Sequence, residues 1–444
     1  MRKCGIGLSF LALSFLVSPS FLFGQDISKA DSLEFQKKME WFKDAKLGIF
    51  IHWGIYSVNG VLESWSFYNG YLPHEEYIKQ AEGFTAKKYD PSYWAALIKE
   101  SGAKYSVITT KHHDGFALWK TNYGHFNAVQ NSPAKKDLIA PFVNALREQD
   151  LKVGLYYSLA DWSYEDYTDF TRKNNRYSIS EDPGRWEQFE QYNLGQLREL
   201  KKNFDPDLWW FDGDWEHTAG EWKVDEIRSL LSEGNSGVIF NSRLQGSGDY
   251  ETPEIGLPIH RPGDDYWELA MTMNDSWGYQ SNDKNYKTPQ QVIDIFVDCI
   301  SKGGNLLLDI GPKADGTIPE EQETILKELG KWTSKHREAI YGVEKGIPYD
   351  YFYGPTALSK DSTTLFLYVR DIPKDGKIVL KGIENKINRI FVVGNGTILN
   401  WEVFCKVFWS DYPGITYIEI PENAIDPYYT VIAVQLEGGI KLHE

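Results

Sequence analysis

The stretch DLWWFDGDW, residues 207–215, shows most directly how this chain is organised. Its apolar run LWWF, residues 208–211, predicts a short buried strand that ends at a carboxylate, Asp212, followed directly by Gly213. Enzymes built on parallel β-barrels place their catalytic side chains at such strand ends. Asp-Gly is also a common turn pair, so Asp212 taken alone could equally cap a turn. The neighbouring segments therefore have to establish its role.

The segments on either side repeat this pattern of an apolar strand followed by an amphipathic helix. Strands are expected in KLGIFIHWG, YSVITTKHH, KVGLYYS, GVIFNSR, YWELAMTM and GGNLLLDIG, and helices over residues 90–101, 136–149, 186–203, 224–231, 289–301 and 320–336. Continuously apolar strands joined through helices predict a parallel sheet that is covered by helices. About eight such strands over roughly 300 residues predict a (β/α)8-like TIM barrel. The chain has no glycine-rich phosphate-binding loop at a helix start, so nucleotide binding is not expected.

From residue 343 the pattern changes to short alternating segments separated by Gly, Pro, Asn and Asp. Such segments predict an antiparallel β-sandwich. We therefore expect two domains, a catalytic barrel over residues 25–342 and a small sandwich over residues 343–444. We expect the sandwich to pack against the barrel as a structural domain, with a sugar-binding module as the alternative.

The first 24 residues have the layout of a secretory signal peptide. Arg2 and Lys3 form a basic start, an apolar run over residues 5–17 follows, and small or turn-forming residues lead to Gly24. The run is short for a membrane-spanning helix, and no cysteine follows it where a lipid anchor would be attached. We expect a periplasmic or secreted protein without a membrane anchor.

Composition narrows the classes of partner. The formal net charge is −16, which argues against nucleic acid or anionic lipid and favours neutral substrates. Aromatic residues make up 15% of the chain, and their faces suit the apolar faces of sugar rings. Cys299 and Cys405 lie in apolar surroundings, so we expect buried free thiols, although one disulfide between them is possible.

Polar side chains recur at the predicted strand ends. They are His52, His112, His113, Tyr157, Asp212, Arg243 and Glu254, with Trp53, Trp210 and Trp277 as aromatic neighbours. Together they describe a pocket with hydrogen-bond donors, two carboxylates and aromatic faces, which is what carbohydrate hydrolysis requires. The adjacent His112 and His113 leave a metal site as the rival interpretation. Neighbouring residues at a strand end point apart, so we expect no metal.

The motifs, taken in order, resemble those of the α-L-fucosidases, glycoside hydrolase family 29. They are FKDAKLGIFIHWGIYSV, KYSVITTKHHDGFALW, GLYYSLADW, DLWWFDGDW, GDYETPE, NDSWGY and GGNLLLDIGPKADGTIP. The resemblance covers about residues 40–342, and the family also carries a β-sandwich behind its barrel. It implies a retaining exo-enzyme that removes terminal α-L-fucose from oligosaccharides or glycoconjugates by double displacement, without a metal or organic cofactor.

The resemblance also implies roles for individual residues. It makes Asp212 the nucleophile that forms a covalent fucosyl-enzyme. It implies a fucose pocket lined by His52, His112, His113, Tyr157, Trp210 and Arg243, with Trp65 and Trp277 in its wall. Glu63 belongs to a motif in which related enzymes often show Glu directly before Trp, whereas Ser64 intervenes here. This departure leaves the role of Glu63 open.

The acid/base residue varies in position among related fucosidases. Glu254, at the end of DYETPE, is our first choice, Glu268 in YWELAMTM the second and Glu251 the third. Glu268 could instead be a structural carboxylate. We expect the acid/base to be buried against aromatic rings so that it keeps its proton. A glycosidase for α-L-galactosides or β-D-fucosides and a non-catalytic sugar-binding barrel remain alternatives.

Overall fold

The computed structural model describes residues 24–260, 262 and 266–444. The expected signal peptide therefore lies outside the described residues, apart from Gly24, where helix α1 (Gly24–Ala45) begins. The chain separates into two compact units, Met1–Lys38 and Met39–Glu444, and the features below belong to the second. Within the described residues, no helix combines the length and apolar character needed to cross a bilayer.

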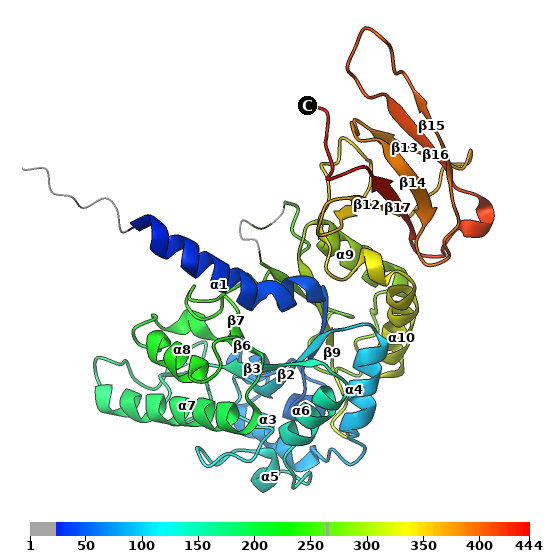
Figure 1. The fold of residues 1–444 in the computed structure, drawn as a ribbon. Helices are drawn as coiled ribbons and strands as arrows, with labels where there is room; N and C mark the ends of the chain where they lie inside the picture. Colours follow the sequence, from blue (N-terminus) through cyan, green and yellow to red (C-terminus); the bar gives the residue numbers. More distant parts are fainter. Residues whose placement is uncertain (1–23, 261, 263–265) are drawn as a thin grey trace, which may run out of the picture. The chain divides into compact units, whose positions relative to one another are not determined.

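A curved parallel sheet forms the centre of this unit (Figure 1). Among the described residues it has seven strands in the order β7-β6-β3-β2-β1-β9-β8. These are β1 (Leu47–Ile51), β2 (Tyr105–Lys111), β3 (Lys152–Ser158), β6 (Leu208–Asp212), β7 (Ile239–Phe240), β8 (Glu268–Thr272) and β9 (Asn305–Ile310). The strands are apolar on both faces because one face lines the inside of the barrel and the other packs under helices.

Residues 250–254 take the place of an eighth strand. Bridges join Asn241 to Tyr250 on the β7 side, and join Glu251 to Trp267 and Glu254 to Ala270 on the β8 side. This stretch includes Pro253, which has no N–H to donate and so interrupts regular pairing. The predicted (β/α)8-like architecture is confirmed, with irregular chain at one of its positions.

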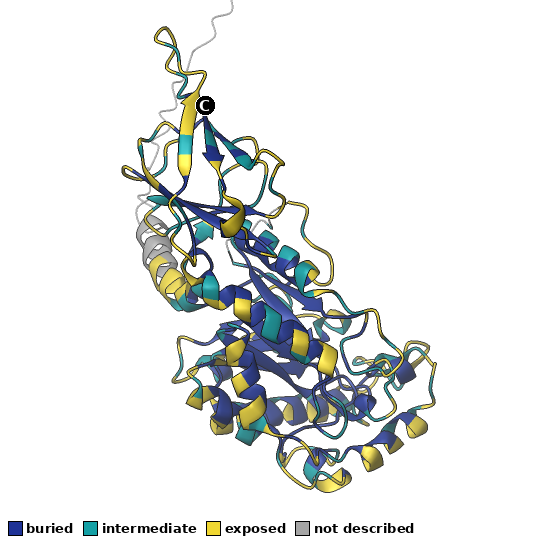
Figure 2. Cartoon of the chain, turned by 90° about the vertical axis from the view of Figure 1, so that its right-hand side faces the viewer, coloured by how far each residue is buried: buried dark blue, intermediate teal, exposed yellow. Residues whose placement is uncertain are grey.

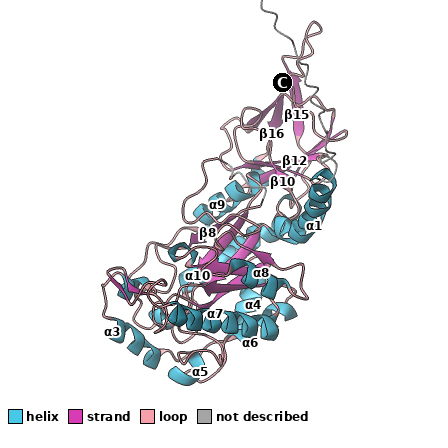
Figure 3. Cartoon of the chain, turned by 90° about the vertical axis from the view of Figure 1, so that its left-hand side faces the viewer, coloured by secondary structure: helices cyan, strands magenta, loops and turns pink. Residues whose placement is uncertain are grey.

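Helices form a continuous outer layer, in which each contacts the next (Figure 3). In spatial order they are α9 (Pro289–Ser301), α10 (Glu320–Lys335), α4 (Pro91–Glu100), α6 (Ile139–Glu148), α7 (Pro183–Phe204) and α8 (Val224–Ser232). Three of them begin in the same way, with Asp90, Asp182 or Thr288 capping a backbone N–H and proline at the next position. Helix α7 therefore begins three residues before the expected residue 186. Their buried sides face the sheet and their exposed sides face solvent (Figure 2).

Shorter elements lie in the loops that follow the strands. They are α2 (Trp65–Tyr68), α3 (His74–Lys79), α5 (Ala128–Asn131), a hairpin of β4 (Asp169–Thr171) and β5 (Asn174–Asn175), and the 3-10 turn η3 (Asp214–Glu216). Parallel strands deliver their carboxyl ends to one rim, so these loops surround that rim.

The C-terminal region consists of two antiparallel sheets. One contains β10 (Glu344–Lys345), β11 (Thr356–Leu358), β12 (Thr364–Val369), β17 (Thr430–Leu436) and β14 (Ile387–Val392); the other contains β13 (Lys377–Lys381), β16 (Ile415–Glu419) and β15 (Asn400–Phe404). Leu365 and Leu367 of β12 face the core between the sheets. Phe366 and Tyr368 alternate with them and join the hydrophobic core of the barrel. The predicted β-sandwich is confirmed, while the boundary at residue 342 stays a prediction because both regions share one compact unit.

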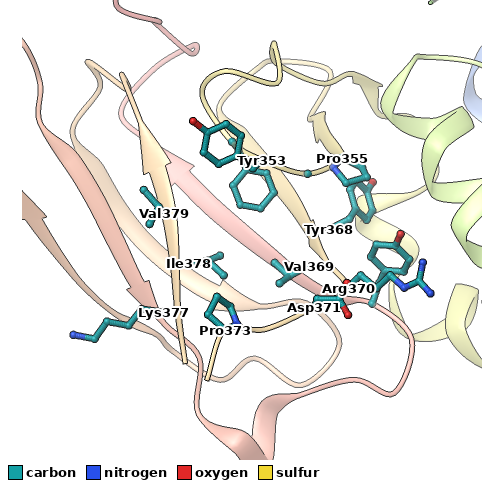
Figure 4. Close-up of a pocket in the computed structure, with 13 residues that line it drawn as sticks. Tyr353, Pro355, Tyr368, Val369, Arg370, Asp371, Pro373, Lys377, Ile378 and Val379 are labelled. Atoms are coloured by element: carbon teal, nitrogen blue, oxygen red, sulfur yellow. The ribbon is translucent and has the colours of Figure 1, made fainter. Parts of the chain in front are cut away.

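A cavity of about 310 Å³ opens between β12 and β13 of the sandwich (Figure 4). Val369 and Ile378 form part of its apolar lining, and Tyr353 and Arg370 lie at its edge. Arg370 is paired with Asp294 of α9, with Nη1 2.7 Å from Oδ2. This pair ties the sandwich to the helical layer of the barrel.

The two described cysteines are both free thiols, but only one of them is buried. Cys299 lies on the buried side of α9, in the core, as expected. Cys405 is exposed, so its predicted burial is wrong. It follows the last residue of β15, an edge strand whose residues 402–404 are also exposed. Its apolar neighbours therefore do not bury the Cys405 thiol.

Candidate active site

Asp212 stands at the inner rim of the barrel because of its position in β6. Side chains alternate along a strand, so Trp210 and Asp212 point inward while Trp209 and Phe211 pack under the helices. Gly213 follows with φ +74°, and a side chain there would come within 2.9 Å of the Cβ atom of Ala160. This turn ends the strand and leaves Asp212 at the rim with its side chain 12% exposed.

The Asp212 carboxylate is held by two hydrogen bonds. Arg243 donates from Nη1 to Oδ1 at 2.9 Å, and the Tyr156 hydroxyl donates to Oδ2 at 2.9 Å. Burial alone would raise the pKa of Asp212, but Arg243, His113 and Tyr156 outweigh it and hold the pKa below its usual value. The group is therefore ionised at neutral pH, as a nucleophile must be.

Arg243 joins Asp212 to a second carboxylate. Its Nη2 donates to Oε2 of Glu254 at 2.6 Å, and its guanidinium lies 4.7 Å from the centre of the Trp210 ring. The two carboxylates raise the pKa of Arg243 above its usual value despite its burial, so the cation is permanent. The Glu254 side chain is 37% exposed. The expected burial of this residue against aromatic rings is therefore wrong.

Glu268 lies at the opposite end of the barrel. It is the first residue of β8, is fully buried, and accepts hydrogen bonds from the Tyr105 hydroxyl and, at 3.1 Å, from Nε1 of Trp210. Burial raises the pKa of Glu268 to about 7. Glu251 is bridged to Trp267, one residue before β8, and so lies toward the same end. The structure thus brings Glu254, and not Glu268, together with Asp212.

Each histidine expected in the pocket is oriented through its Nδ1 atom. The partners are Asp309 for His52 at 2.7 Å, Ser64 for His112 at 2.5 Å and Ser158 for His113 at 2.5 Å. With Nδ1 engaged, the Nε2 atom of each ring is left for a ligand. The rings lie close together, with centroids 4.3 Å apart for His112 and His113 and 6.1 Å apart for His52 and His112.

Burial keeps these histidines neutral. It lowers the pKa of His52 to about 3 and that of His113 to about 4, and it holds the pKa of His112 well below its usual value. Nε2 of His113 is buried, has no hydrogen-bond partner among the described residues, and lies 3.6 Å from Oδ2 of Asp212. An unpaired buried nitrogen is costly, so this atom indicates where a ligand hydroxyl would bind.

Three tryptophans surround these polar groups. Trp277 lies 5.0 Å from the His52 ring, and Trp65 lies 5.6 Å from the His113 ring. Trp210 points into the barrel and is stacked on Tyr156 with centroids 5.6 Å apart. This group of side chains therefore offers apolar faces and neutral hydrogen-bonding groups side by side, which suits a sugar ring.

Glu63 and Ser64 form hydrogen bonds that hold the segment after Trp277 and the ring of His112. Oε1 of Glu63 accepts a hydrogen bond of 2.6 Å from the backbone N–H of Gly278, directly after Trp277. Burial raises the pKa of Glu63 to about 7. Ser64, the residue that departs from the expected motif, is the partner of His112. Glu63 thus positions the Trp277 segment, and Ser64 positions a pocket histidine.

Two residues expected at the pocket lie elsewhere. The Tyr157 hydroxyl donates toward Asn193 and Gln196 of α7, at 2.6 and 2.8 Å, on the outer face of the sheet. Trp53 also packs under the helices, where its Nε1 donates to the carbonyl of Lys313 at 3.0 Å. Both predictions are wrong because these strands present the neighbouring residue to the inside, which for β3 is Tyr156.

Two residues that fix the position of Asp212 were missed in the sequence analysis. Tyr156 donates a hydrogen bond to the Asp212 carboxylate, and only the alternation of β3 distinguishes it from Tyr157. Asn241 forms two hydrogen bonds with the backbone of Phe211, directly before Asp212. Its Oδ1 accepts from the Phe211 N–H at 2.8 Å, and its Nδ2 donates to the Phe211 carbonyl at 2.9 Å. Its place after the apolar run VIF was the available signal. In the described part of the chain, no three His, Cys, Asp or Glu side chains are grouped as metal ligands.

Comparison with known sequences gives matches over most of the chain. A family model described as α-L-fucosidase matches residues 25–338. An α-L-fucosidase of Branchiostoma floridae is 31% identical over 437 residues, which cover 88% of this chain and 90% of that protein.

Comparison with solved structures gives matches over a similar length of the chain. α-L-Fucosidase isoenzyme 1 from Paenibacillus thiaminolyticus superposes with a TM-score of 0.82 at 31% identity, covering 91% of this chain and 100% of the other. A family 29 α-L-fucosidase from Bacteroides thetaiotaomicron was trapped as a covalent intermediate with 2-fluoro-fucosyl fluoride. It superposes with a TM-score of 0.79 at 28% identity, and the match covers 90% of this chain and 96% of the other. Both regions of the described fold therefore have counterparts in these proteins.

Proposed function

This chain belongs to the α-L-fucosidase family of glycoside hydrolases, and on that premise we propose that it is a retaining exo-enzyme. Its substrate is terminal α-L-fucose on an oligosaccharide or glycoconjugate. The observation that carries the proposal is the Arg243 guanidinium, which contacts one carboxylate at the strand end, Asp212, and a second, more exposed one, Glu254. Retention requires two carboxyl groups about 5 to 5.5 Å apart, and one arginine head group keeps these two close.

In the first step Asp212 attacks the anomeric carbon, and the bond to the leaving oxygen breaks. Glu254 gives its proton to that oxygen, so the leaving sugar departs as an alcohol and a fucosyl-enzyme remains. In the second step Glu254 takes a proton from water, whose oxygen attacks the same carbon and releases Asp212. The exposure of Glu254 supports this role because both the leaving group and water must reach it.

His52, His112, His113 and Trp277 supply recognition in this proposal. Their neutral imidazoles can donate to or accept from the ring hydroxyls without the desolvation cost of a buried charge. Nε2 of His113 is placed so close to Asp212 that a hydroxyl next to the anomeric carbon is its natural partner. Arg243 keeps Asp212 ionised between turnovers.

Hydrolysis of an aryl α-L-fucoside tests the proposal directly. We expect turnover with α-L-fucose released first as the α-anomer, which proton NMR detects before mutarotation. Faster hydrolysis of an aryl α-L-galactoside or β-D-fucoside would favour a related glycosidase instead. Binding of fucose without turnover of any of the three would identify a sugar-binding barrel.

We further propose that residues 1–24 are a signal peptide and that the enzyme acts in the periplasm or outside the cell. Residues 343–444 then serve as a structural domain whose residues Phe366 and Tyr368 complete the core of the barrel. Amino-terminal sequencing of the exported protein tests the first point, with a start near Gln25 expected. Expression of residues 25–342 alone tests the second, with loss of soluble enzyme expected.

A further inference from the structure

A tryptophan stands exposed beside the pocket, three residues after the nucleophile. Trp215 lies in the 3-10 turn η3 and is 49% exposed. Its ring is stacked on Trp65 at an interplanar angle of 15°, with centroids 6.1 Å apart, and lies 5.7 Å from the His113 ring. Trp215 therefore continues the aromatic wall of the pocket outward into solvent.

The turn that carries Trp215 is firmly anchored. Glu216 accepts hydrogen bonds from Nε1 of Trp162 at 2.9 Å and from the Tyr167 hydroxyl. The carbonyl of Asp214 accepts from Nε1 of Trp222 at 2.8 Å. Both neighbours of Trp215 are thus held in place, so its exposure results from a fixed backbone and not from a loose loop.

The rings near Trp215 form a series from the interior to the surface. Trp162 is fully buried and lies 4.9 Å from Trp65, which is half-buried and stacks on the exposed Trp215. The inner member, Trp162, also touches the His113 ring at 4.6 Å. A ligand that fills the pocket and extends out of it would meet Trp65 first and Trp215 next.

We propose that Trp215 is a stacking surface for the sugar to which the fucose is attached, that is, for the leaving group. This inference rests on the proposed function, since only a fucosidase has such a leaving group. The departing sugar has to lie outside the rim, where Glu254 is exposed, and Trp215 presents an aromatic face at the same rim. A pyranose ring has an apolar C–H face that packs on an indole, while its hydroxyls stay in water.

The chemistry favours a neutral pyranose as the occupant. The chain as a whole carries a net charge of −16, so an anionic sugar would be repelled. Binding energy from a non-reacting part of a substrate can be used to position the reacting bond. Trp215 therefore contributes to kcat/KM for a glycan more than for a substrate whose leaving group has no ring.

The test compares two substrates through one ratio. The first is whichever of an α1,2-, α1,3/4- or α1,6-fucosylated oligosaccharide the wild type cleaves best, and the second is α-L-fucosyl fluoride. For Trp215→Ala we expect the ratio of kcat/KM, oligosaccharide over fluoride, to fall about tenfold through loss of one aromatic contact. Trp215→Phe keeps a ring and should recover most of the ratio.

Trp409→Ala is the matched control, because Trp409 is 73% exposed on the sandwich, away from the barrel rim. It should leave both rates as in the wild type. Product inhibition by the defucosylated oligosaccharide gives an independent readout, and its Ki should rise in Trp215→Ala.

The outcomes separate the inference from the proposed function. Wild-type cleavage of both substrates with an unchanged ratio in Trp215→Ala overturns the inference alone. An equal fall on both substrates also overturns it, since Trp215 would then only support the fucose pocket through Trp65. Failure of the wild type to cleave either substrate overturns the proposed function, and this inference with it.

Discussion

Nη1 of Arg243 lies 2.9 Å from Oδ1 of Asp212. The same guanidinium reaches Glu254, so a single side chain sets the spacing of the two carboxylates to which we assign the chemistry. Arg243 follows β7, and Glu254 ends the irregular stretch between β7 and β8. The irregularity of the barrel at this point therefore coincides with the proposed acid/base.

Asp212→Asn should lower kcat on an aryl α-L-fucoside by at least about 1,000-fold, because an amide cannot form the covalent intermediate. The fold should persist, since asparagine has the same shape and still accepts from Tyr156. Asp207→Asn is the control, because Asp207 lies directly before the same strand and is paired with Lys152 at 2.7 Å; it should keep wild-type kcat. Near-normal turnover by Asp212→Asn would remove this residue from the nucleophile role.

Glu254→Ala should lose turnover that added azide restores on an activated aryl fucoside. The small anion replaces the water that needs a general base and yields a fucosyl azide of retained configuration. Glu268→Ala should show no azide rescue, because Glu268 lies at the other end of the barrel beside Tyr105. Rescue of Glu268→Ala or Glu251→Ala in place of Glu254→Ala would contradict the assignment.

Tyr156→Phe removes one of the donors that lower the pKa of Asp212. The pKa of Asp212 should rise, so the acidic limb of the kcat/KM profile should move to higher pH. Loss of a hydrogen bond to a charged group should also lower kcat/KM about tenfold. The pH dependence of kcat/KM measures both effects.

Tyr157→Phe provides the control for Tyr156→Phe, since its hydroxyl is bonded outside the barrel to Asn193 and Gln196. It should lower the melting temperature through loss of buried hydrogen bonds and leave the pH profile of kcat/KM unmoved. A shifted profile in Tyr157→Phe would mean that the inner and outer faces of β3 have been assigned the wrong way round.

Glu268→Gln should change how stability depends on pH. Burial raises the pKa of Glu268 from 4.5 to about 7, so the folded chain favours the protonated acid. The stability that Glu268 adds to the folded chain is complete below pH 4.5 and is lost as pH rises through about 7. Glutamine stays neutral, so the fall in melting temperature between pH 5 and pH 8 should be smaller in the variant. Glu320→Gln, on the exposed start of α10, should follow the wild-type curve.

Local patterns in the sequence were enough to predict the elements. The apolar run before Asp212 is the strand β6, and the helices expected from residues 90 and 289 begin at Pro91 and Pro289, because such signals act within a few residues. The alternation of apolar strands with helices, followed from residue 343 by short alternating segments, also predicted the barrel followed by a sandwich. In each case the information lies in neighbouring residues, whose propensities need no distant partner.

The direction of a side chain and its distant partners were decided only by the tertiary structure. Tyr156 and Tyr157 are equivalent in the sequence, and the register of β3 in the closed sheet turns the first toward Asp212. Glu254 and Glu268 are both carboxylates in the same region, yet the start of β8 buries one while the irregular stretch carries the other to Arg243. The sequence by itself determined which residues could do the chemistry, and long-range packing determined which of them meet, because contacts between strands depend on register that local propensity does not encode.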